Sequence, residues 1–118
     1  EMQVLIGKTA TRVLNEVMQR HGDSAAGLFF RAQSLIFSLD KNAMEQADDL
    51  LQRAFELEPR AVYLSWRSFL RVSLLLEHRS SDREKTFQEI NDFVATSLVM
   101  DGANSMVLAM AAQARLVA

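Results

Sequence analysis

Apolar side chains recur along this chain at steps of three and four residues, the spacing that places them on one face of an α-helix. In residues 43–57, alanine and leucine follow this spacing, while acidic, basic and amide residues occupy the other side. Residues 28–39 are instead apolar nearly all round the helix, which predicts burial between other helices or exposure to a partner. Segments with the period of two that is typical of strands are missing from the sequence. The pattern therefore predicts an all-α protein.

Breaks in the apolar pattern separate the predicted helices. Residues 21–24, His-Gly-Asp-Ser, are typical of a helix end followed by an N-cap, because glycine tolerates the left-handed conformation and Asp or Ser accepts amide protons. The sole proline, Pro59, disfavours helical geometry at Glu58 and suits the first turn of a new helix. Another break falls at residues 101–104, which contain Gly102.

Two further breaks carry capping patterns. Asn42, with Glu45 three residues later, predicts reciprocal capping of a helix that starts near residue 43, and Ser81 with Glu84 matches the S-x-x-E capping box. Because short loops between helices force antiparallel neighbours, we expect a chain of αα-hairpins with about six helices. The predicted helices cover residues 2–20, 24–38, 43–57, 60–78, 83–100 and 104–117.

The composition predicts one folded domain over residues 1–118. Hydrophobic residues make up 49% and charged residues 24% of the chain, which is ordinary for a globular protein. A net charge of -2 offers no basic footprint for direct nucleic-acid binding. The chain has no cysteine, and its apolar runs are too short for a membrane span, so we expect a cytoplasmic location. Apolar residues continue to the last position, which suggests part of a longer protein.

Five residues around the third predicted helix resemble a known repeat. Ala32, Ala47, Leu51, Ala54 and Pro59 stand in the pattern A-x(14)-A-x(3)-L-x(2)-A-x-E-L-E-P. This pattern resembles the tetratricopeptide repeat, whose second helix carries small residues seven apart before a closing proline. Alanine also lets paired helices approach closely, so the pattern has a packing rationale of its own.

The resemblance covers residues 28–64 well and residues 65–104 loosely. The Trp-Leu-Gly-Tyr positions of the family's first helix are not reproduced, and the hairpin turn is longer than in the family. A shift of 43 residues superposes Ile90, Val94 and Ser97 on the alanine and leucine positions of the first repeat. A second, poorly matched repeat is therefore expected after the first.

The resemblance implies a right-handed array of antiparallel hairpins, a tetratricopeptide-like α-α superhelix, whose first helices line a concave groove. Long-turn repeats of this kind look similar to those of bacterial transcriptional regulators and signalling proteins, where they follow a DNA-binding or catalytic domain. For the first hairpin, the ligand-facing positions that the resemblance implies are Phe29, Gln33 and Ile36. For the next hairpin two alternatives stay open: either Ser65 and Phe69 face the groove, or Arg67 and Arg71 do.

The fourth predicted helix carries a basic stripe, since Arg60, Arg67, Arg71 and His78 follow one another at steps of seven, four and seven. This stripe either grips an acidic peptide or pairs with Asp and Glu of the preceding helix. Trp66 is a candidate both for a core anchor and for a groove hot spot.

The residues that could carry catalysis have simpler structural explanations. His21 and His78 stand at predicted helix ends, where a cation interacts favourably with the helix dipole. The neighbouring carboxylates of residues 48–49 diverge by about 100° on a helix, so they predict a solvated face. The six Met and seven Phe predict a packed core. Because no phosphate loop, metal-ligand cluster or nucleophile elbow appears, we expect neither an enzyme nor a cofactor.

Two functions from different classes are compatible with this sequence. The first is a protein–protein interaction module, a regulatory or sensory part of a bacterial transcriptional regulator or signalling protein. Its partner would be a protein or peptide, another domain of the same chain, or a second copy. The alternative is an all-helical small-ligand-sensing domain of a bacterial transcription regulator, with a cavity lined by Phe and Met.

Overall fold

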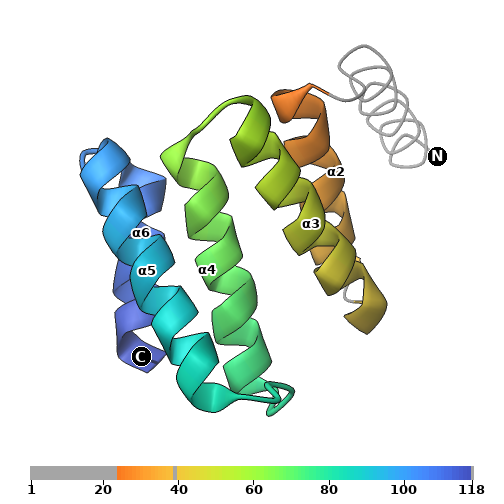
Figure 1. Ribbon diagram of the computed structural model, residues 1–118, viewed down its shortest axis with the longest axis vertical. Coiled ribbons are helices and arrows are strands. Elements are labelled where there is room, and N and C mark those ends of the chain that lie inside the picture. The colour runs from red at the N-terminus through yellow and green to blue at the C-terminus, as the bar shows by residue number, and fades with distance from the viewer. Residues whose placement is uncertain (1–23, 39, 118) are drawn as a thin grey trace, which may run out of the picture. The chain divides into compact units, whose positions relative to one another are not determined.

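The computed structural model describes residues 24–38 and 40–117, and this part of the chain forms helices joined by short turns (Figure 1). The five helices described are α2 (Ala25–Phe37), α3 (Lys41–Leu57), α4 (Ala61–Leu76), α5 (Arg83–Asp101) and α6 (Ser105–Val117). The all-α prediction is confirmed, and every bound lies within two residues of its predicted position. The predicted helix 2–20 and His21 lie outside the described residues.

The chain divides into two compact units between Leu57 and Glu58. The single domain that the sequence suggests stays a prediction. The division falls one residue before Pro59, where the backbone leaves helical geometry. Of the described helices, the first unit holds α2 and α3, and the second holds α4, α5 and α6.

In the first unit, α2 and α3 lie side by side as an antiparallel hairpin (Figure 1). Four of the five positions in the repeat pattern are fully buried: Ala32, Ala47, Leu51 and Ala54. The fifth, Pro59, is exposed in the turn before α4. Leu57, which the sequence places on the same apolar face, is 61% exposed. It is the last residue of α3, so this expectation is wrong for the helix end.

In the second unit, α4 and α5 form an antiparallel hairpin and α6 packs against both (Figure 1). One cluster of buried side chains joins the three helices, and it consists of Val72, Leu75, Ile90, Val94, Ala111 and Ala114. In α5, the buried residues Ile90, Val94 and Ser97 have the same spacing as Ala47, Leu51 and Ala54 of α3. The two helices α3 and α5 therefore bury side chains at the same spacing.

Four serine and threonine side chains are buried in the second unit, and each donates to a backbone carbonyl three or four residues earlier in the chain. Ser65 donates to Ala61 over 3.3 Å and Ser68 to Ser65 over 2.7 Å. The other two buried hydroxyls, those of Thr86 and Ser97, have acceptors at 2.9 Å. Since a buried hydroxyl without a partner is costly, these local bonds make the polar atoms compatible with the core.

The starts of α2, α3, α5 and α6 are capped by side chains, though not always by the predicted ones, and the N-cap residue of α4, Arg60, makes no side-chain cap. Ser24 Oγ accepts from the amide of Gly27 at 3.2 Å, which confirms the predicted N-cap of α2. At α3, the carboxylate of Asp40 accepts from the Asn42 amide at 3.0 Å. The predicted capping by Asn42 and Glu45 is wrong, because the helix already begins at residue 41 and both residues lie inside it.

The same displacement occurs at α5. Asp82 is the N-cap and its Oδ1 accepts from the Lys85 amide at 3.1 Å, so the predicted capping box of Ser81 and Glu84 is wrong by one residue. A carboxylate at this position also favours the positive end of the helix dipole. At α6, Asn104 Oδ1 accepts from two successive amides, those of Met106 and Val107, at 2.9 and 3.2 Å.

His78 closes the end of α4 through its backbone. Its φ of 55° places it in the left-handed region, immediately after the C-cap residue Glu77. The amide of His78 donates to the carbonyl of Leu75 at 3.2 Å, and the amide of Arg79 donates to that of Leu74 at 2.9 Å. These two bonds define a Schellman motif, in which glycine is the usual residue at the left-handed position. His78 therefore stands at the end of a helix, as the sequence predicts, and its main chain closes that end.

Candidate functional site

An open groove runs along the α2/α3 hairpin and has a volume of about 530 Å³. Both helices contribute side chains to it, so the hairpin itself shapes the groove. The lining residues are Arg31, Ser34, Leu35, Glu45, Gln46, Asp49 and Leu50.

The groove has an apolar floor between two polar walls. Leu50 is only 6% exposed and Leu35 is half-buried, so these leucines lie lowest. The wall from α2 carries the exposed Arg31, and the wall from α3 carries the exposed carboxylates of Glu45 and Asp49. Within the described part of the chain, the side chains of these three charged residues make no hydrogen bond or ion pair. Their charges are therefore not neutralised by contacts within the hairpin.

The sequence predicts that Phe29, Gln33 and Ile36 line a groove. The observed groove lies on the other flank of α2 from Phe29 and Gln33. At 100° per residue, Arg31 and Gln33 diverge to opposite sides of the buried Ala32. Phe29 lies on the Gln33 side, and both of these side chains are half-buried. The third predicted residue, Ile36, is 4% exposed and is a core residue instead of a groove residue.

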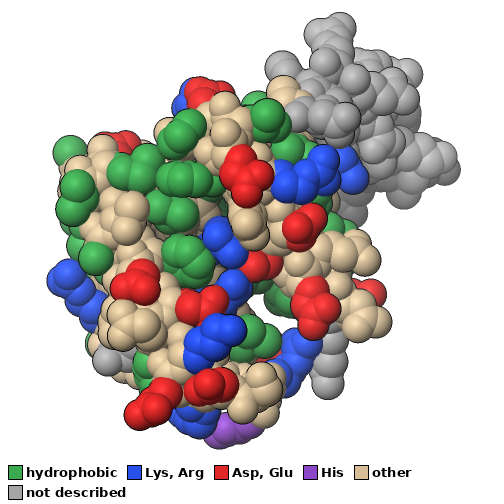
Figure 2. All heavy atoms as spheres, viewed as in Figure 1, with side chains coloured by type: hydrophobic (Ala, Val, Ile, Leu, Met, Phe, Trp, Pro, Cys, Tyr) green, Lys and Arg blue, Asp and Glu red, His purple; other side chains and the backbone are tan. Residues whose placement is uncertain are grey.

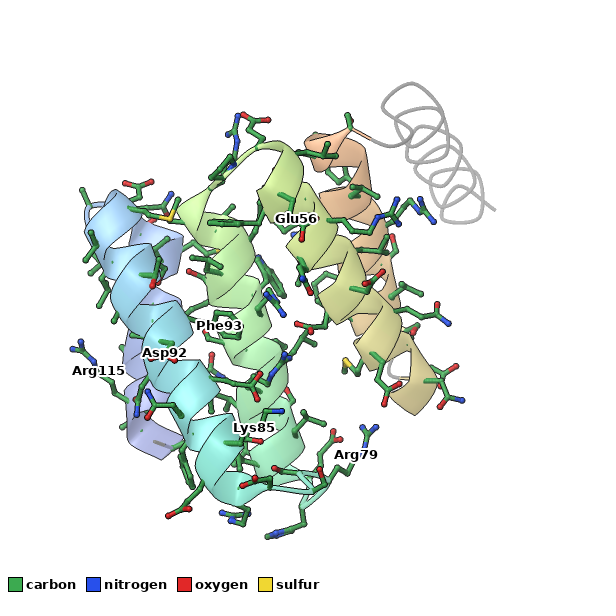
Figure 3. All side chains as sticks on the ribbon, in the orientation of Figure 1. Glu56, Arg79, Lys85, Asp92, Phe93 and Arg115 are labelled. Atoms are coloured by element: carbon green, nitrogen blue, oxygen red, sulfur yellow. The ribbon has the colours of Figure 1, made fainter. Side chains whose placement is uncertain are left out.

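In the second unit, two arginines of the predicted basic stripe meet one aromatic ring of α5. The guanidinium carbons of Arg67 and Arg71 lie 4.6 and 5.6 Å from the ring centroid of Phe93. Figure 3 shows Phe93 projecting from α5 toward α4. Arg71 Nε also donates to Glu89 Oε2 at 3.0 Å. Both arginines are half-buried, so cation–π contact and ion pairing tie α4 to α5.

The other predicted residues of α4 serve the packing of that helix. Trp66 is 8% exposed, and its ring meets that of Phe69 edge-on with centroids 5.6 Å apart. Ser65 is buried, which leaves the half-buried Phe69 as the outer member of the Ser65–Phe69 alternative. Trp66 is therefore a core anchor in this structure.

The start of α4 carries a local ion pair at its N-cap. Arg60 Nε donates to Glu58 Oε1 at 2.9 Å, and this pairing raises the pKa of the exposed Arg60 guanidinium. Burial raises the pKa of the Tyr63 hydroxyl, while the positive charge of Arg60 acts in the opposite direction. Pro59 and Arg60 also line a smaller hollow of about 260 Å³ with residues from the α5–α6 turn.

A second surface is apolar but has no charged wall. The outer side of α6 carries Leu108 and Leu116, the latter 89% exposed, and Arg115 is the only charged residue of the helix. Arg115 projects away from the three helices in Figure 3. Near the turn between α5 and α6, hydrophobic side chains also gather on the face seen in Figure 2.

The described residues form no candidate metal centre and no candidate membrane-spanning helix. No three His, Cys, Asp or Glu side chains among residues 24–38 and 40–117 come together as metal ligands would. None of the helices formed by these residues combines the length and apolar character of a membrane span. Comparison of the chain with protein-family models, curated proteins and solved structures finds no match.

Sequence reasoning missed the charged walls of the α2/α3 groove. The available signal was the pair Glu45 and Asp49, one helical turn apart on α3, which the pattern assigned to a solvated face. Recognising the groove also required knowing which flank of α2 lies next to them. That depends on how the two helices pack, since a spacing pattern does not distinguish one flank of a buried row from the other.

Proposed function

We propose that this chain is a non-catalytic protein–protein interaction module built from tetratricopeptide-like helical hairpins. The packing supports this proposal, because Ala32, Ala47 and Ala54 are fully buried where the repeat pattern requires small side chains. Repeat hairpins of this kind bury a continuous core and leave other surfaces for recognition. The proposed setting, a bacterial transcriptional regulator or signalling protein, rests on the resemblance of the sequence pattern.

The observation that carries the proposal is the α2/α3 groove. Its leucine floor offers apolar burial, and its exposed Arg31, Glu45 and Asp49 have charges that no contact within the hairpin neutralises. An apolar centre with a polar rim is the usual arrangement of a recognition surface. The volume falls within the range of small-molecule sites, but the groove is open to solvent, whereas such sites bury most of their ligand. This shape favours part of a polypeptide over an enclosed small ligand.

Selection from a random displayed peptide library against the full chain tests the proposal. We expect enriched peptides that bind with dissociation constants in the micromolar to millimolar range, as for small interfaces that bury little area. Leu35→Asp places a charge on the groove floor and should abolish binding, and circular dichroism should show that the variant remains helical. Leu108→Asp is the matched control, since it introduces the same charge on the outer side of α6.

The result that contradicts the proposal is equally concrete. If no peptide is enriched over a matrix without protein, while small molecules raise the melting temperature, the ligand-sensing alternative replaces the interaction module. If Leu35→Asp and Leu108→Asp have the same effect on the affinity for the selected peptides, peptide binding stands but its site is not the groove.

A further inference from the structure

The α2/α3 groove is short, which limits what can occupy it. Its lining spans residues 31–35 of α2 and 45–50 of α3, or about 6 Å and about 8 Å along the helix axes at the rise of an α-helix. An extended chain advances about 3.3 to 3.6 Å per residue, so the groove matches about two or three residues of an extended peptide.

The two walls of the groove differ in charge. Glu45 and Asp49 are four residues apart on α3, so their Cβ atoms are about 5 to 6 Å apart and a single cation can approach both carboxylates. Arg31 on the opposite wall is the only cation among the described residues that line the groove. With two carboxylates on one wall and one guanidinium on the other, the α3 side attracts positive charge and the α2 side does not.

The floor specifies the second requirement. Leu35 and Leu50 offer apolar surface beside the acidic wall, and burial of an apolar side chain there removes area from water. Ser34 and Gln46 offer side-chain donors and acceptors at the rim, where a peptide backbone needs hydrogen-bond partners. An apolar side chain and a basic side chain next to each other in sequence fit these two features together.

We infer that the α2/α3 groove binds a short extended peptide segment in which an apolar side chain occupies the leucine floor and an adjacent lysine or arginine pairs with Glu45 and Asp49. This inference rests on the proposed function, because it names the chemistry of the partner at the same groove. The partner's charge is opposite to the one that the basic stripe of α4 suggests, since that stripe would select an acidic peptide.

Amide NMR titration of the full chain with three capped tetrapeptides tests the inference. Acetyl-Gly-Leu-Lys-Gly-amide carries both required side chains, Gly-Leu-Glu-Gly reverses the charge, and Gly-Ser-Lys-Gly removes the apolar group. At low ionic strength we expect the Leu-Lys peptide to shift the amides of residues 31–35 and 45–50 and to bind most tightly. Loss of the leucine should weaken binding by about tenfold or more, and charge reversal by at least about threefold.

Isosteric variants identify the carboxylates. Glu45 and Asp49 lie on an exposed helix surface, so Glu45→Gln and Asp49→Asn should preserve the fold. Each substitution should raise the dissociation constant of the Leu-Lys peptide by about threefold. Glu84→Gln is the matched control, because it removes the same charge from an exposed position in α5 and should leave binding unchanged. Arg31→Gln should strengthen the binding of the Leu-Lys peptide or leave its affinity unchanged.

Three outcomes overturn the inference. They are equal or tighter binding of the Leu-Glu peptide, shifts centred on α6 or on the α4–α5 arginines, and an unchanged dissociation constant in the doubly neutralised variant Glu45→Gln/Asp49→Asn. In each case, peptides enriched from the random library would still support an interaction module, so the partner chemistry would fail alone. Absence of any enriched peptide would remove the proposed function, and the inference with it.

Discussion

His78 in its left-handed conformation leads to a quantitative prediction about the stability of the second unit. We predict that His78→Gly stabilises this unit. The φ of 55° costs a residue with a Cβ atom about 1 to 2 kcal/mol, whereas glycine adopts it readily. The variant keeps both backbone hydrogen bonds of the Schellman motif. In these bonds the amide of residue 78 donates to the Leu75 carbonyl, and the Arg79 amide donates to the Leu74 carbonyl.

The size of the effect follows from two opposing contributions. Relief of the left-handed strain favours the variant by about 1 to 2 kcal/mol, and the greater backbone freedom of glycine in the unfolded chain opposes it by about 0.5 to 1 kcal/mol. The two ranges combine to a net gain of about 0 to 1.5 kcal/mol, and the midpoint, about 0.75 kcal/mol, is the expected gain in the free energy of unfolding. For a chain of this size, that gain corresponds to a rise in melting temperature of about 2 to 5 °C.

Urea unfolding followed by the fluorescence of Trp66 measures this effect, because the chain's only tryptophan lies in the second unit. Two variants serve as controls. His78→Ala removes the imidazole but keeps the Cβ atom, so it should change stability by less than about 0.5 kcal/mol. Glu77→Gly adds glycine where φ is -89°, so it should destabilise by about 0.5 to 1 kcal/mol. If His78→Gly is neutral, or as destabilising as Glu77→Gly, the strain argument is refuted.

Three further predictions concern packing, titration and capping. Ala54→Leu should overpack its fully buried site and lower the free energy of unfolding by about 1 to 3 kcal/mol, as measured by thermal unfolding. The control Ala95→Leu, at an exposed position, should change stability by less than about 0.5 kcal/mol. Equal melting temperatures for the two variants would exclude tight packing at residue 54. Tyr63 is the only tyrosine, so the ultraviolet absorbance of tyrosinate should report a pKa above 10.0 in the folded chain and a lower one in denaturant. Because the pKa of Tyr63 is higher in the folded chain, the contribution of Tyr63 to stability is fully present below pH 10.0 and is lost as pH rises through the folded-state pKa. Titration of folded and denatured chain at the same pH would contradict this. In urea unfolding, Asp82→Ala should lower the free energy of unfolding by about 1 kcal/mol, and Ser81→Ala should leave it nearly unchanged. A larger loss for Ser81→Ala than for Asp82→Ala would instead support the capping box that the sequence suggests.

Helix positions in this protein are predictable from local chemistry, while the capping residues are less so. Apolar spacing and the breaks around Gly102 and Pro59 place the described helix ends within two residues. The caps at Asp40 and Asp82 differ from the predicted Asn42 and Ser81, because neighbouring polar residues compete for the same amides. Which of them caps depends on the backbone conformation at each position, and the capping motif alone does not determine that.

The candidate groove was less predictable than the helices. The buried row through Ala32 follows from spacing, but the residues on its two flanks, Arg31 and Gln33, are equivalent in a helical pattern. The choice between flanks is made by the packing of α2 against α3. The same holds for Arg71, whose pairing with Glu89 joins residues from different helices.

The buried serine hydroxyls of the second unit have a consequence for how the sequence of this unit can change. Since Ser68 and Ser97 satisfy their hydroxyls with carbonyls of their own helices, a facing helix needs to match only their size. Exchange between serine and alanine at these sites can then accumulate with little effect on the register of the facing helix. The unit therefore keeps its helix packing while the residue type at these buried positions changes.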